Sequence, residues 1–385
     1  MDGRENRKPL RDFGISLFLC GDVMTGRGID QVLPHPCHPA IHEPYMKSAL
    51  GYVELAERKT GPIPRRASFS YVWGDALSEL RRETPDLRII NLETAVTTRA
   101  DYDAEKGINY RMHPANVPAL TAAGIDCCVL ANNHVLDWGY EGLKETLTAL
   151  RGAGVKTAGA GADLAEAEAP ARFEIEGKGS VLVFSFGSET SGIPRGWGAT
   201  EQGPGVHLLE DLSDRTVQRI SRQVRRLKGK DAVVVASIHW GENWGYPIFR
   251  DQKEFAHGLI DAAGVDLIHG HSSHHVKAME VYRGKLILYG SGDFLNDYEG
   301  IEGHEVFRDD LSLMYFARLD PATGKLLSLR MIPMQIRHFR VSRAAAPDAL
   351  WLRDVLNREG SGLGTRVEVE ADGTLTLQSE GLPAS

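Results

Sequence analysis

The sequence predicts an α/β fold, and three observations support this class. Short aliphatic runs bounded by glycine or polar residues recur along the chain, which is typical of buried strands in a parallel sheet. Segments with helical spacing of apolar residues separate many of these runs. Each run also leads into Asp, Glu, Asn or His. The five runs cover residues 17–20, 87–90, 127–131, 232–238 and 265–268.

The polar residues that follow these runs predict one composite metal site. Ligands of open α/β sheets bind in the crevice beyond the carboxyl ends of the strands. Oxygen and imidazole ligands suit Mn, Zn or Fe. The absence of cysteine from this set of ligands argues against a purely structural zinc site. We therefore expect one or two divalent transition-metal ions. The predicted ligands are Asp22, Glu93, Asn133, His239, His271 and His274.

His134 adjoins a predicted metal ligand and is the candidate general acid or base. Asp137 has two interpretations, because it either orients His134 or caps the helix that follows. Glu242 follows a His-Trp-Gly turn and is either a solvated loop carboxylate or part of the substrate site. We expect Asp293 and Asn296, after the last strand, to cap or brace the site.

Helices follow from apolar residues at helical spacing. The first is predicted over 137–152, from the candidate N-cap Asp137 to the stop residue Gly152. A second, over 214–230, has one apolar face and one arginine-rich face, so we expect its basic side to be solvated. A third, over 251–263, leads into the histidine-rich strand end.

The remaining strands follow from β-branched runs and turn residues. Residues 181–186 predict a strand, and 281–289 predict a hairpin turned at Arg283-Gly284. The tail predicts a hairpin with strands 311–319 and 325–341, a helix near 347–357 and a closing hairpin at Asp372-Gly373. No linker-like composition precedes the tail, so we expect 306–385 to extend the domain formed by 15–305.

Residues 31–72 interrupt the alternation of strands and helices. The segment is rich in proline, carries His35, Cys37, His38 and His42, and has a helical patch over 45–58. A loop of this length in a compact domain is usually a lid or binding element. A second metal site is the alternative, but the proline-rich spacing and the lack of a fourth well-placed ligand favour a lid.

Composition limits the classes of function. The 385 residues are 42% hydrophobic and 25% charged, with a formal net charge of −8 and scattered Lys and Arg, so no nucleic-acid face is expected. Residues 1–14 lack the apolar region of a secretory signal, and no apolar stretch has membrane-spanning length. Neighbouring Cys127 and Cys128 cannot pair with each other in a regular strand. We therefore expect a reduced, cytoplasmic protein.

Six segments stand out in order along the chain: CGDVMTGRG, NLETAVT, VLANNHVLDWGYEGL, the Gly159–Gly161 turn, SIHWGENW and GHSSHHVKAMEVYRGKLILYGSGDF. Together they resemble the bacterial capsule synthesis proteins called CapA, which belong to the calcineurin-like metallophosphatase superfamily. This resemblance covers roughly residues 15–300. It implies a four-layer αββα metallophosphatase-like sandwich with a C-terminal β-rich extension.

The resemblance also implies roles for individual residues. Asn133 matches a metal-binding asparagine, and His134 matches the histidine that protonates a leaving group. Arg27 and Arg111 match CapA arginines, and each is either a clamp for a carboxylate or phosphate or an ordinary surface ion pair. Superfamily phosphatases usually carry histidine where this chain has Met24, a departure that CapA-like proteins share.

By resemblance, the function is metal-dependent hydrolase-type chemistry, phosphoesterase-like or amidase-like, in capsule or poly-γ-glutamate-type polymer metabolism. Two alternatives stay open. One is a metal-assisted peptide Cα epimerase of CapA-like fold, and the other is a non-catalytic subunit that binds or assembles the polymer. The expected partner is an anionic polymer or peptide substrate, and the sequence does not determine the oligomeric state.

Overall fold

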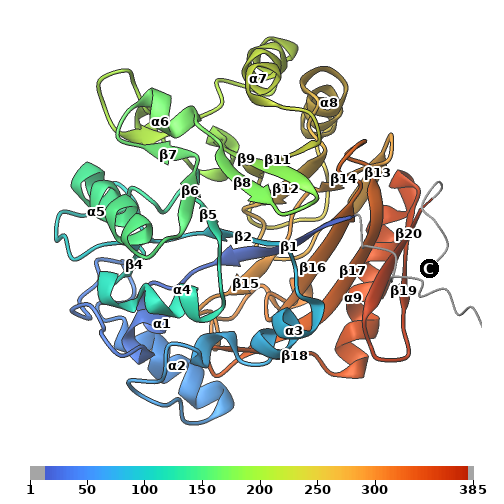
Figure 1. Cartoon of the computed structure of the whole chain (residues 1–385). Coiled ribbons are helices and arrows are strands. Elements are labelled where there is room, and N and C mark those ends of the chain that lie inside the picture. The colour runs from blue at the N-terminus through green and yellow to red at the C-terminus, as the bar shows by residue number, and fades with distance from the viewer. Residues whose placement is uncertain (1–13, 380–385) are drawn as a thin grey trace, which may run out of the picture.

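The computed structural model describes residues 14–379 and contains two large β-sheets (Figure 1). Residues 1–13 lie outside this range. They belong to the polar segment 1–14, in which we expect no secretory signal. In the ten-stranded sheet, β15 (Asp293–Leu295) also pairs with β1 and β18 (Arg340–Arg343) with β17. Its main order is β19 (Thr365–Val369), β20 (Leu375–Ser379), β17 (Leu326–Arg337), β16 (Leu311–Leu319), β1 (Ile15–Val23), β2 (Leu87–Leu92), β5 (Cys127–Val129) and β6 (Lys156–Ala158).

The second sheet has six strands, and two short ladders complete the β structure. The short ladders pair β3 (Ala95–Val96) with β4 (Arg111–Met112), and β7 (Ala160–Gly161) with β10 (Gly205–Val206). The order of the second sheet is β13 (Met279–Tyr282), β14 (Lys285–Leu288), β12 (Leu267–His271), β11 (Ala232–His239), β9 (Gly179–Gly187) and β8 (Ala171–Ile175).

The five predicted strand runs are all strands, but they are divided between the two sheets. β1, β2 and β5 are parallel neighbours in the larger sheet, and β11 and β12 are parallel neighbours in the smaller one. Both sheets also contain antiparallel pairs, such as β1 with β16. The protein is therefore a mixed α/β protein.

Alternation of side chains along the strands builds the core. Leu17 and Leu19 of β1 belong to a cluster that also contains Val183 of β9 and Val235 of β11, so the two sheets pack face to face. Phe18, between the two leucines, points to the opposite face of its sheet and joins a cluster with helical residues. Each sheet thus buries one face against the other sheet and one face against helices.

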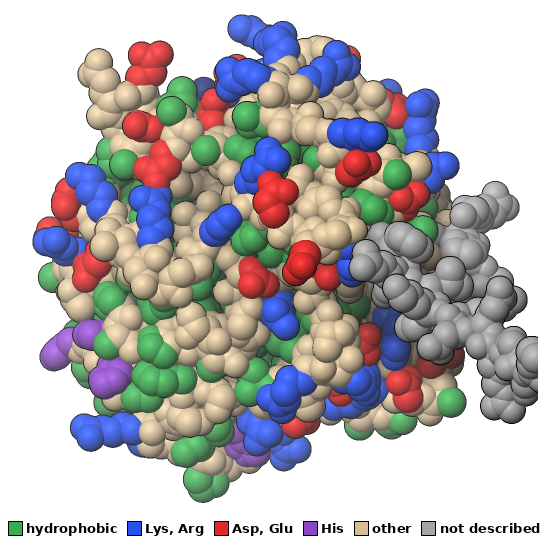
Figure 2. All heavy atoms as spheres, in the orientation of Figure 1, with side chains coloured by type: hydrophobic (Ala, Val, Ile, Leu, Met, Phe, Trp, Pro, Cys, Tyr) green, Lys and Arg blue, Asp and Glu red, His purple; other side chains and the backbone are tan. Residues whose placement is uncertain are grey.

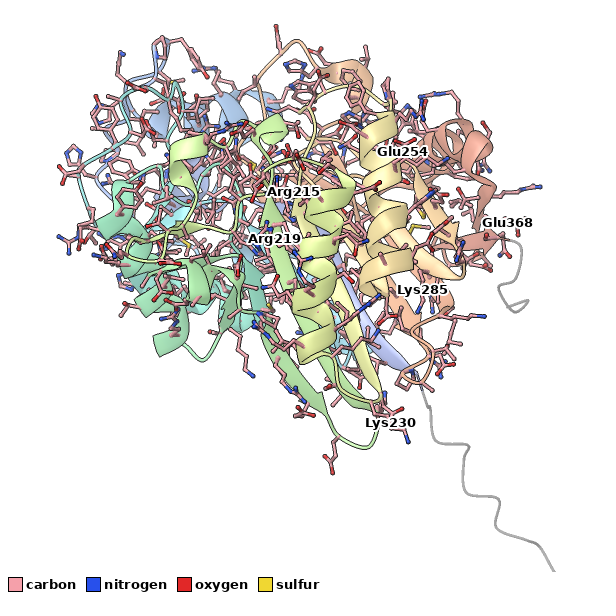
Figure 3. The ribbon with its side chains drawn as sticks, turned by 90° about the horizontal axis from the view of Figure 1, so that it is seen from above. Arg215, Arg219, Lys230, Glu254, Lys285 and Glu368 are labelled. Atoms are coloured by element: carbon pink, nitrogen blue, oxygen red, sulfur yellow. The ribbon has the colours of Figure 1, made fainter. Side chains whose placement is uncertain are left out.

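Helices cover the outer faces of both sheets, which gives layers in the order helix, sheet, sheet, helix (Figure 1). Figure 3 shows α7 and α8 side by side, with the labelled Arg215 and Arg219 on α7. Arg215 is exposed, as expected for the solvated basic face. The helices are α1 (Arg27–Val32), α2 (Leu50–Thr60), α3 (Ala76–Glu83), α4 (Pro118–Ala122), α5 (Gly139–Gly152), α6 (Leu164–Glu168), α7 (Asp214–Leu227), α8 (Arg250–Gly258) and α9 (Ala346–Gly360).

The prediction that Asp137 caps a helix is wrong. Helix α5 starts at Gly139, and the side chain of its N-cap residue, Trp138, makes no capping hydrogen bond. The Asp137 carboxylate instead accepts hydrogen bonds from the backbone N–H of Tyr110 (2.6 Å) and from Lys106 (2.5 Å), and it lies beside His134. The other interpretation, that Asp137 orients His134, agrees with this geometry.

The tail contains the predicted hairpins and helix, with one correction. The predicted strand 325–341 is two strands, β17 and β18, because the chain turns at His338-Phe339. Both residues have positive φ, 57° and 53°. The turn carries no Gly or Asn to indicate it, so the sequence pattern continues through it unbroken.

None of the helices within residues 14–379 has the length and apolar character that a membrane crossing requires. All four cysteines are free and buried. On the face shown in Figure 2, acidic and basic side chains are interspersed over much of the surface.

Candidate metal centre

The carboxyl ends of β1, β11 and β12 bring a histidine pair and a carboxylate together. His239 and His271 are direct partners in the parallel register of β11 and β12. Their Nδ1 atoms lie 2.7 Å apart, and His271 Nδ1 lies 3.8 Å from Asp22 Oδ1. One ligand atom from each of the three residues falls within 4.8 Å of the others, and all three are buried. Within residues 14–379 this is the one group of three or more His, Cys, Asp or Glu that meets this condition.

The electrostatics of this group fit a divalent cation. Burial, and then repulsion from Asp293, raises the pKa of Asp22 to about 7. Burial, and then repulsion from Asp22, raises the pKa of Glu93 well above its ordinary value. Burial lowers the pKa values of His239 and His271, so both imidazoles stay neutral and keep a nitrogen lone pair. Neutral histidines beside buried carboxylates that lack enough compensating positive charge are a suitable donor set for a metal ion.

His239 has predicted ligands on both sides of its ring. Its Nδ1 atom faces His271, whereas its Nε2 atom lies 3.0 Å from Asn133 Oδ1 and 3.9 Å from Glu93 Oε1. The structure therefore places two predicted ligands on each side of the His239 ring. Asp22 and His271 lie on the Nδ1 side, and Glu93 and Asn133 lie on the Nε2 side.

His274 lies at the edge of the centre, outside the close group of three. Its Nδ1 atom is 2.9 Å from Asp293 Oδ1, and Asn296 donates to the other carboxylate oxygen of Asp293 at 2.8 Å. Burial lowers the pKa of His274, but Asp293 and Asp22 together raise it by more, so the net shift is upward. Asp293 and Asn296 thus brace His274, which agrees with the prediction that they cap or brace the site, although Asp293 lies in strand β15 and not after the last strand.

His134 and Asp137 form a buried pair beside the metal ligands. His134 Nδ1 lies 2.6 Å from Asp137 Oδ2, and His134 Nε2 lies 3.9 Å from Glu93 Oε1. Burial lowers the pKa of His134 to about 4, and the Lys106 ammonium also lowers it, while Asp137 raises it. The imidazole is therefore neutral at pH 7. Donation from Nδ1 to Asp137 leaves the lone pair on Nε2, on the side of Glu93.

Three further residues support the centre and were not predicted from the sequence. Asn91 donates to Asp22 Oδ1 (2.7 Å) and to Glu93 Oε2 (3.1 Å). Its place near the end of β2, two residues before Glu93, could have indicated this role. Ser237 contacts the rings of His269 and His271, at 3.0 and 2.9 Å. Lys106 contacts Asp137 and the carbonyl oxygen of Asn133 from a distant loop, and no sequence signal indicates this.

The two predicted substrate arginines have different environments. Arg27 is buried and donates to Glu43 (3.0 Å) and twice to Asp297 (3.0 and 2.5 Å). Its interpretation as a surface ion pair is therefore wrong. Arg111 lies with its guanidinium carbon 3.9 Å from the ring centroid of Trp138 and donates to backbone carbonyls. It lines an open pocket away from the histidine pair.

Glu242 and the histidines of the insertion lie outside the group of close ligands. Glu242 is exposed in the loop after β11. The ligand atoms of His35, Cys37, His38 and His42 do not gather into a metal-sized group, so the alternative of a second metal site there is wrong.

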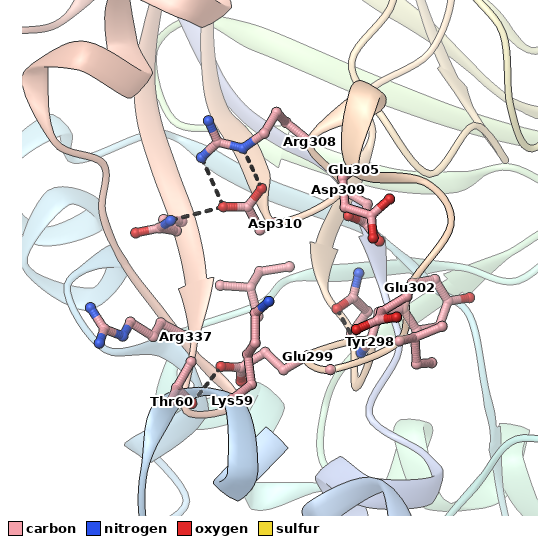
Figure 4. A pocket seen from close by; sticks show the side chains of 15 residues that line it. Lys59, Thr60, Tyr298, Glu299, Glu302, Glu305, Arg308, Asp309, Asp310 and Arg337 are labelled. Carbon is pink, nitrogen blue, oxygen red and sulfur yellow. Dashed lines mark hydrogen bonds and ion pairs between the residues drawn. The ribbon is translucent and has the colours of Figure 1, made fainter. Parts of the chain in front are cut away.

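A pocket of about 370 Å³ adjoins the centre on the side of His274 (Figure 4). Tyr298 lines it and packs edge-on against His274, with ring centroids 5.3 Å apart. Burial, and then Asp293, raises the pKa of Asp309, also in its wall, to about 6. Figure 4 shows Arg308 paired with Asp310 across the top of the pocket. Five carboxylates line this space: Glu299, Glu302, Glu305, Asp309 and Asp310.

The fold and the buried centre define a two-sheet α/β protein with a group of Asp and His residues able to hold a metal ion. The sequence model of the bacterial capsule synthesis proteins, PGA_cap, matches residues 16–298. The chain belongs to this family, and its predicted resemblance to CapA is confirmed.

Individual relatives extend beyond the matched segment. A probable polyglutamine synthesis accessory protein of Mycobacterium tuberculosis is 47% identical over 364 residues, covering 94% of this chain and 96% of the relative. The PGA biosynthesis protein CapA of Bacillus subtilis is 27% identical over 373 residues, covering 96% and 84%. A crystal structure described as a novel phosphatase of Mycoplasma pneumoniae aligns with a TM-score of 0.46 and 11% identity, covering 84% of this chain and 94% of that one.

Proposed function

We propose that this protein is a metal-dependent enzyme of metallophosphatase-like architecture that acts on a glutamate-type capsule polymer by hydrolase-type chemistry. The observation that carries the proposal is the buried group of Asp22, His239 and His271 beside the His134–Asp137 pair. The choice of polymer rests on the family and the relatives, because the matching proteins are described as capsule, PGA or polyglutamine synthesis proteins.

The residues divide into metal ligands and proton carriers. Asp22, His239 and His271 would hold the ion, with Glu93 and Asn133 on the second side of the His239 ring. When bound, a divalent ion supplies Lewis-acid polarisation of a carbonyl or phosphoryl oxygen. His134 accepts a proton at Nε2, and Asp137 holds the ring in the orientation that permits this.

The test is a metal-loading experiment with a substrate panel. Chelator-treated protein, reloaded with Mn, Zn or Fe, is incubated with poly-γ-glutamate, a phosphoester panel and peptides, and the products are analysed by mass spectrometry. Metal-dependent cleavage supports the proposal. Deuterium uptake at Cα without cleavage shows an epimerase instead, and neither reaction with any metal shows a binding or assembly subunit.

Metal affinity is expected to rise with pH up to about 7. The pKa of Asp22 is about 7 in the folded protein, compared with 3.8 for an ordinary aspartate. In the metal-free protein, its contribution to the free energy of unfolding therefore falls as the pH rises from about 3.8 to about 7. Metal binding requires the carboxylate, so binding releases protons over the same window. His239 and His271 are already neutral there and release none.

Isothermal titration calorimetry in buffers of different ionisation enthalpy measures this proton release. Asp22→Asn is the matched control, because it keeps the volume but cannot lose a proton. The variant should bind more weakly and with a flatter pH dependence. Equal proton release by wild type and variant would contradict the assignment.

Asp137→Asn is expected to lower turnover by about a hundredfold at unchanged metal content, because the amide has no charge and a single acceptor oxygen, which Lys106 and Tyr110 also require. Its NH2 group, presented to Nδ1, favours the wrong tautomer of His134. Glu141→Gln is the control, since Glu141 is exposed on α5 and forms an ion pair with Lys144 on the surface. Metal analysis and thermal unfolding of both variants separate loss of turnover from loss of structure. Full activity of Asp137→Asn would remove His134 from the proposed proton transfer.

A further inference from the structure

An open pocket of about 480 Å³ lies between the insertion and the loop that follows β3. Three histidines line it, His38 and His42 from the insertion and His113 after β4, together with Arg111 and Trp138. Within residues 14–379 no Asp or Glu lines this pocket. The space beside His274 has the opposite character, since five carboxylates line it. Figure 2 shows histidine side chains gathered at the left edge of the molecule, near the loops beside α1.

The hydrogen bonds of the histidines leave donors available to the pocket. His38 Nδ1 accepts the backbone N–H of Ala40 at 3.3 Å, and His113 Nδ1 accepts that of Ala115 at 3.1 Å. A neutral imidazole that accepts at Nδ1 carries its proton on Nε2. Both rings therefore keep an N–H donor at Nε2.

Arg111 contributes a fixed positive charge. Its guanidinium stacks on Trp138 and donates to the carbonyl oxygens of Arg99 (2.5 Å) and His38 (3.4 Å), which holds the fork in place. These partners are neutral, and within residues 14–379 no carboxylate forms a direct ion pair with Arg111, although the buried Asp30 carboxylate interacts with its charge. A stacked, immobilised guanidinium with free N–H groups is well suited to a carboxylate.

The acidic residue behind the pocket is already satisfied. Asp30 is buried, and its Oδ1 atom accepts from the backbone of His113 (2.9 Å) and from Asn116 (2.9 Å). Its Oδ2 atom accepts from the backbone of Cys37 at 2.6 Å. Asp30 therefore holds the pocket wall together, and its oxygens are engaged by His113, Asn116 and Cys37 instead of by a direct ion pair with Arg111.

A second pocket, of about 270 Å³, has contacts with residues of both regions. Tyr102 in its wall stacks on His42, with ring centroids 3.7 Å apart. Trp197 in its wall lies 5.0 Å from the Lys106 ammonium, which bonds Asp137. Asp101 and Asp103 line this second pocket, so a lining without carboxylates is a property of the first pocket and not of the second.

We propose that the pocket of His38, His42, His113 and Arg111 is a distal subsite that binds the side-chain carboxylates of a glutamate-type polymer while another part of that chain reaches the metal centre. This inference rests on the proposed function for the identity of the polymer. The donors of the pocket and the absence of carboxylates from its lining select the anion.

The test is direct binding of a γ-linked glutamate oligomer to the full-length protein, measured by calorimetry at low and at high salt. Arg111→Gln is expected to weaken binding about tenfold, the loss of one charge-assisted hydrogen-bonded contact. The exposed pair His38→Gln/His42→Gln should weaken it to a similar degree without disturbing the fold, and binding should weaken with salt. Arg250→Gln, an exposed arginine on α8 paired with Glu254, is the matched control and should bind as wild type.

Three outcomes would overturn the subsite. One is unchanged binding by both pocket variants, another is inorganic phosphate competing as well as the oligomer, and the third is a carboxylated polysaccharide binding as tightly as the oligomer. The same titration with His239→Ala separates this inference from the proposed function. Oligomer binding that survives in a variant without metal supports the subsite even if no hydrolysis is found. Metal binding without any oligomer binding refutes the subsite alone.

Discussion

His239→Ala is expected to abolish stoichiometric metal binding. His239 presents Nδ1 to His271 and Nε2 to Asn133 and Glu93, so one substitution removes a donor from both sides of the centre. Wild-type protein loaded with Mn, Zn or Fe should contain one or two equivalents by mass spectrometry, and the variant should contain almost none. Metal at a free concentration of a hundred times its dissociation constant should also raise the free energy of unfolding of the wild type by about 2.7 kcal/mol. The free energy of unfolding of the variant should not change.

His42→Ala is the control for this experiment. His42 is exposed in the insertion and stacks on Tyr102, so its loss should leave metal content intact. A His239→Ala protein that keeps the full metal content would show that the ion binds elsewhere. Loss of metal from the His42→Ala protein would indicate that the ion binds in the insertion, residues 31–72.

Arg27→Gln is expected to destabilise the protein by about 3–5 kcal/mol, the cost of breaking a buried ion pair from one side. Arg27 neutralises two buried carboxylates, Glu43 and Asp297, and its guanidinium lies 3.9 Å from the ring centroid of Tyr52 and 4.4 Å from that of Tyr110. Glutamine removes the charge and leaves both carboxylates without their cation. Urea unfolding followed by circular dichroism measures the free energy of unfolding.

The matched surface variant is Arg65→Gln. Arg65 forms an ion pair with Glu57, and its side chain is 43% exposed, so its loss should cost less than about 1 kcal/mol. A similar decrease in the free energy of unfolding for both variants would mean that burial does not determine the strength of the ion pairs of Arg27 with Glu43 and Asp297. The contrast also bears on function, because a marked loss of stability would explain reduced activity of Arg27 variants without contact to substrate.

The parts of the fold that the sequence predicted well are those governed by local periodicity. The aliphatic runs of β1, β2, β5, β11 and β12 are strands because uninterrupted β-branched and aliphatic residues satisfy both faces of a covered sheet. Their division into two sheets was not visible in the residues themselves, since a run such as 232–238 reads alike in either sheet. The turn at His338-Phe339 was missed because it contains no Gly or Asn, and a bulky residue such as Phe339 rarely adopts positive φ.

The candidate centre was predictable in composition but not in arrangement. Strand ends identify Asp22, His239 and His271, whose side chains converge because the parallel strands β11 and β12 place the two histidines in register. Spacing along the chain cannot show that His274 turns to Asp293, nor that Asp137 accepts from Lys106 instead of capping a helix. These choices are made by residues far apart in sequence, such as the loop that carries Lys106.

The position of β1 in the sheet has a consequence for synthesis of the chain. β1 carries Asp22 and pairs with β2 on one side, but its other neighbour, β16, ends only at Leu319. At ordinary ribosome speeds, the open edge of β1 waits on the order of tens of seconds for its partner. An unpaired edge invites pairing with other chains. Nascent or truncated chains that stop before β16 are therefore the species most exposed to aggregation and most dependent on chaperones.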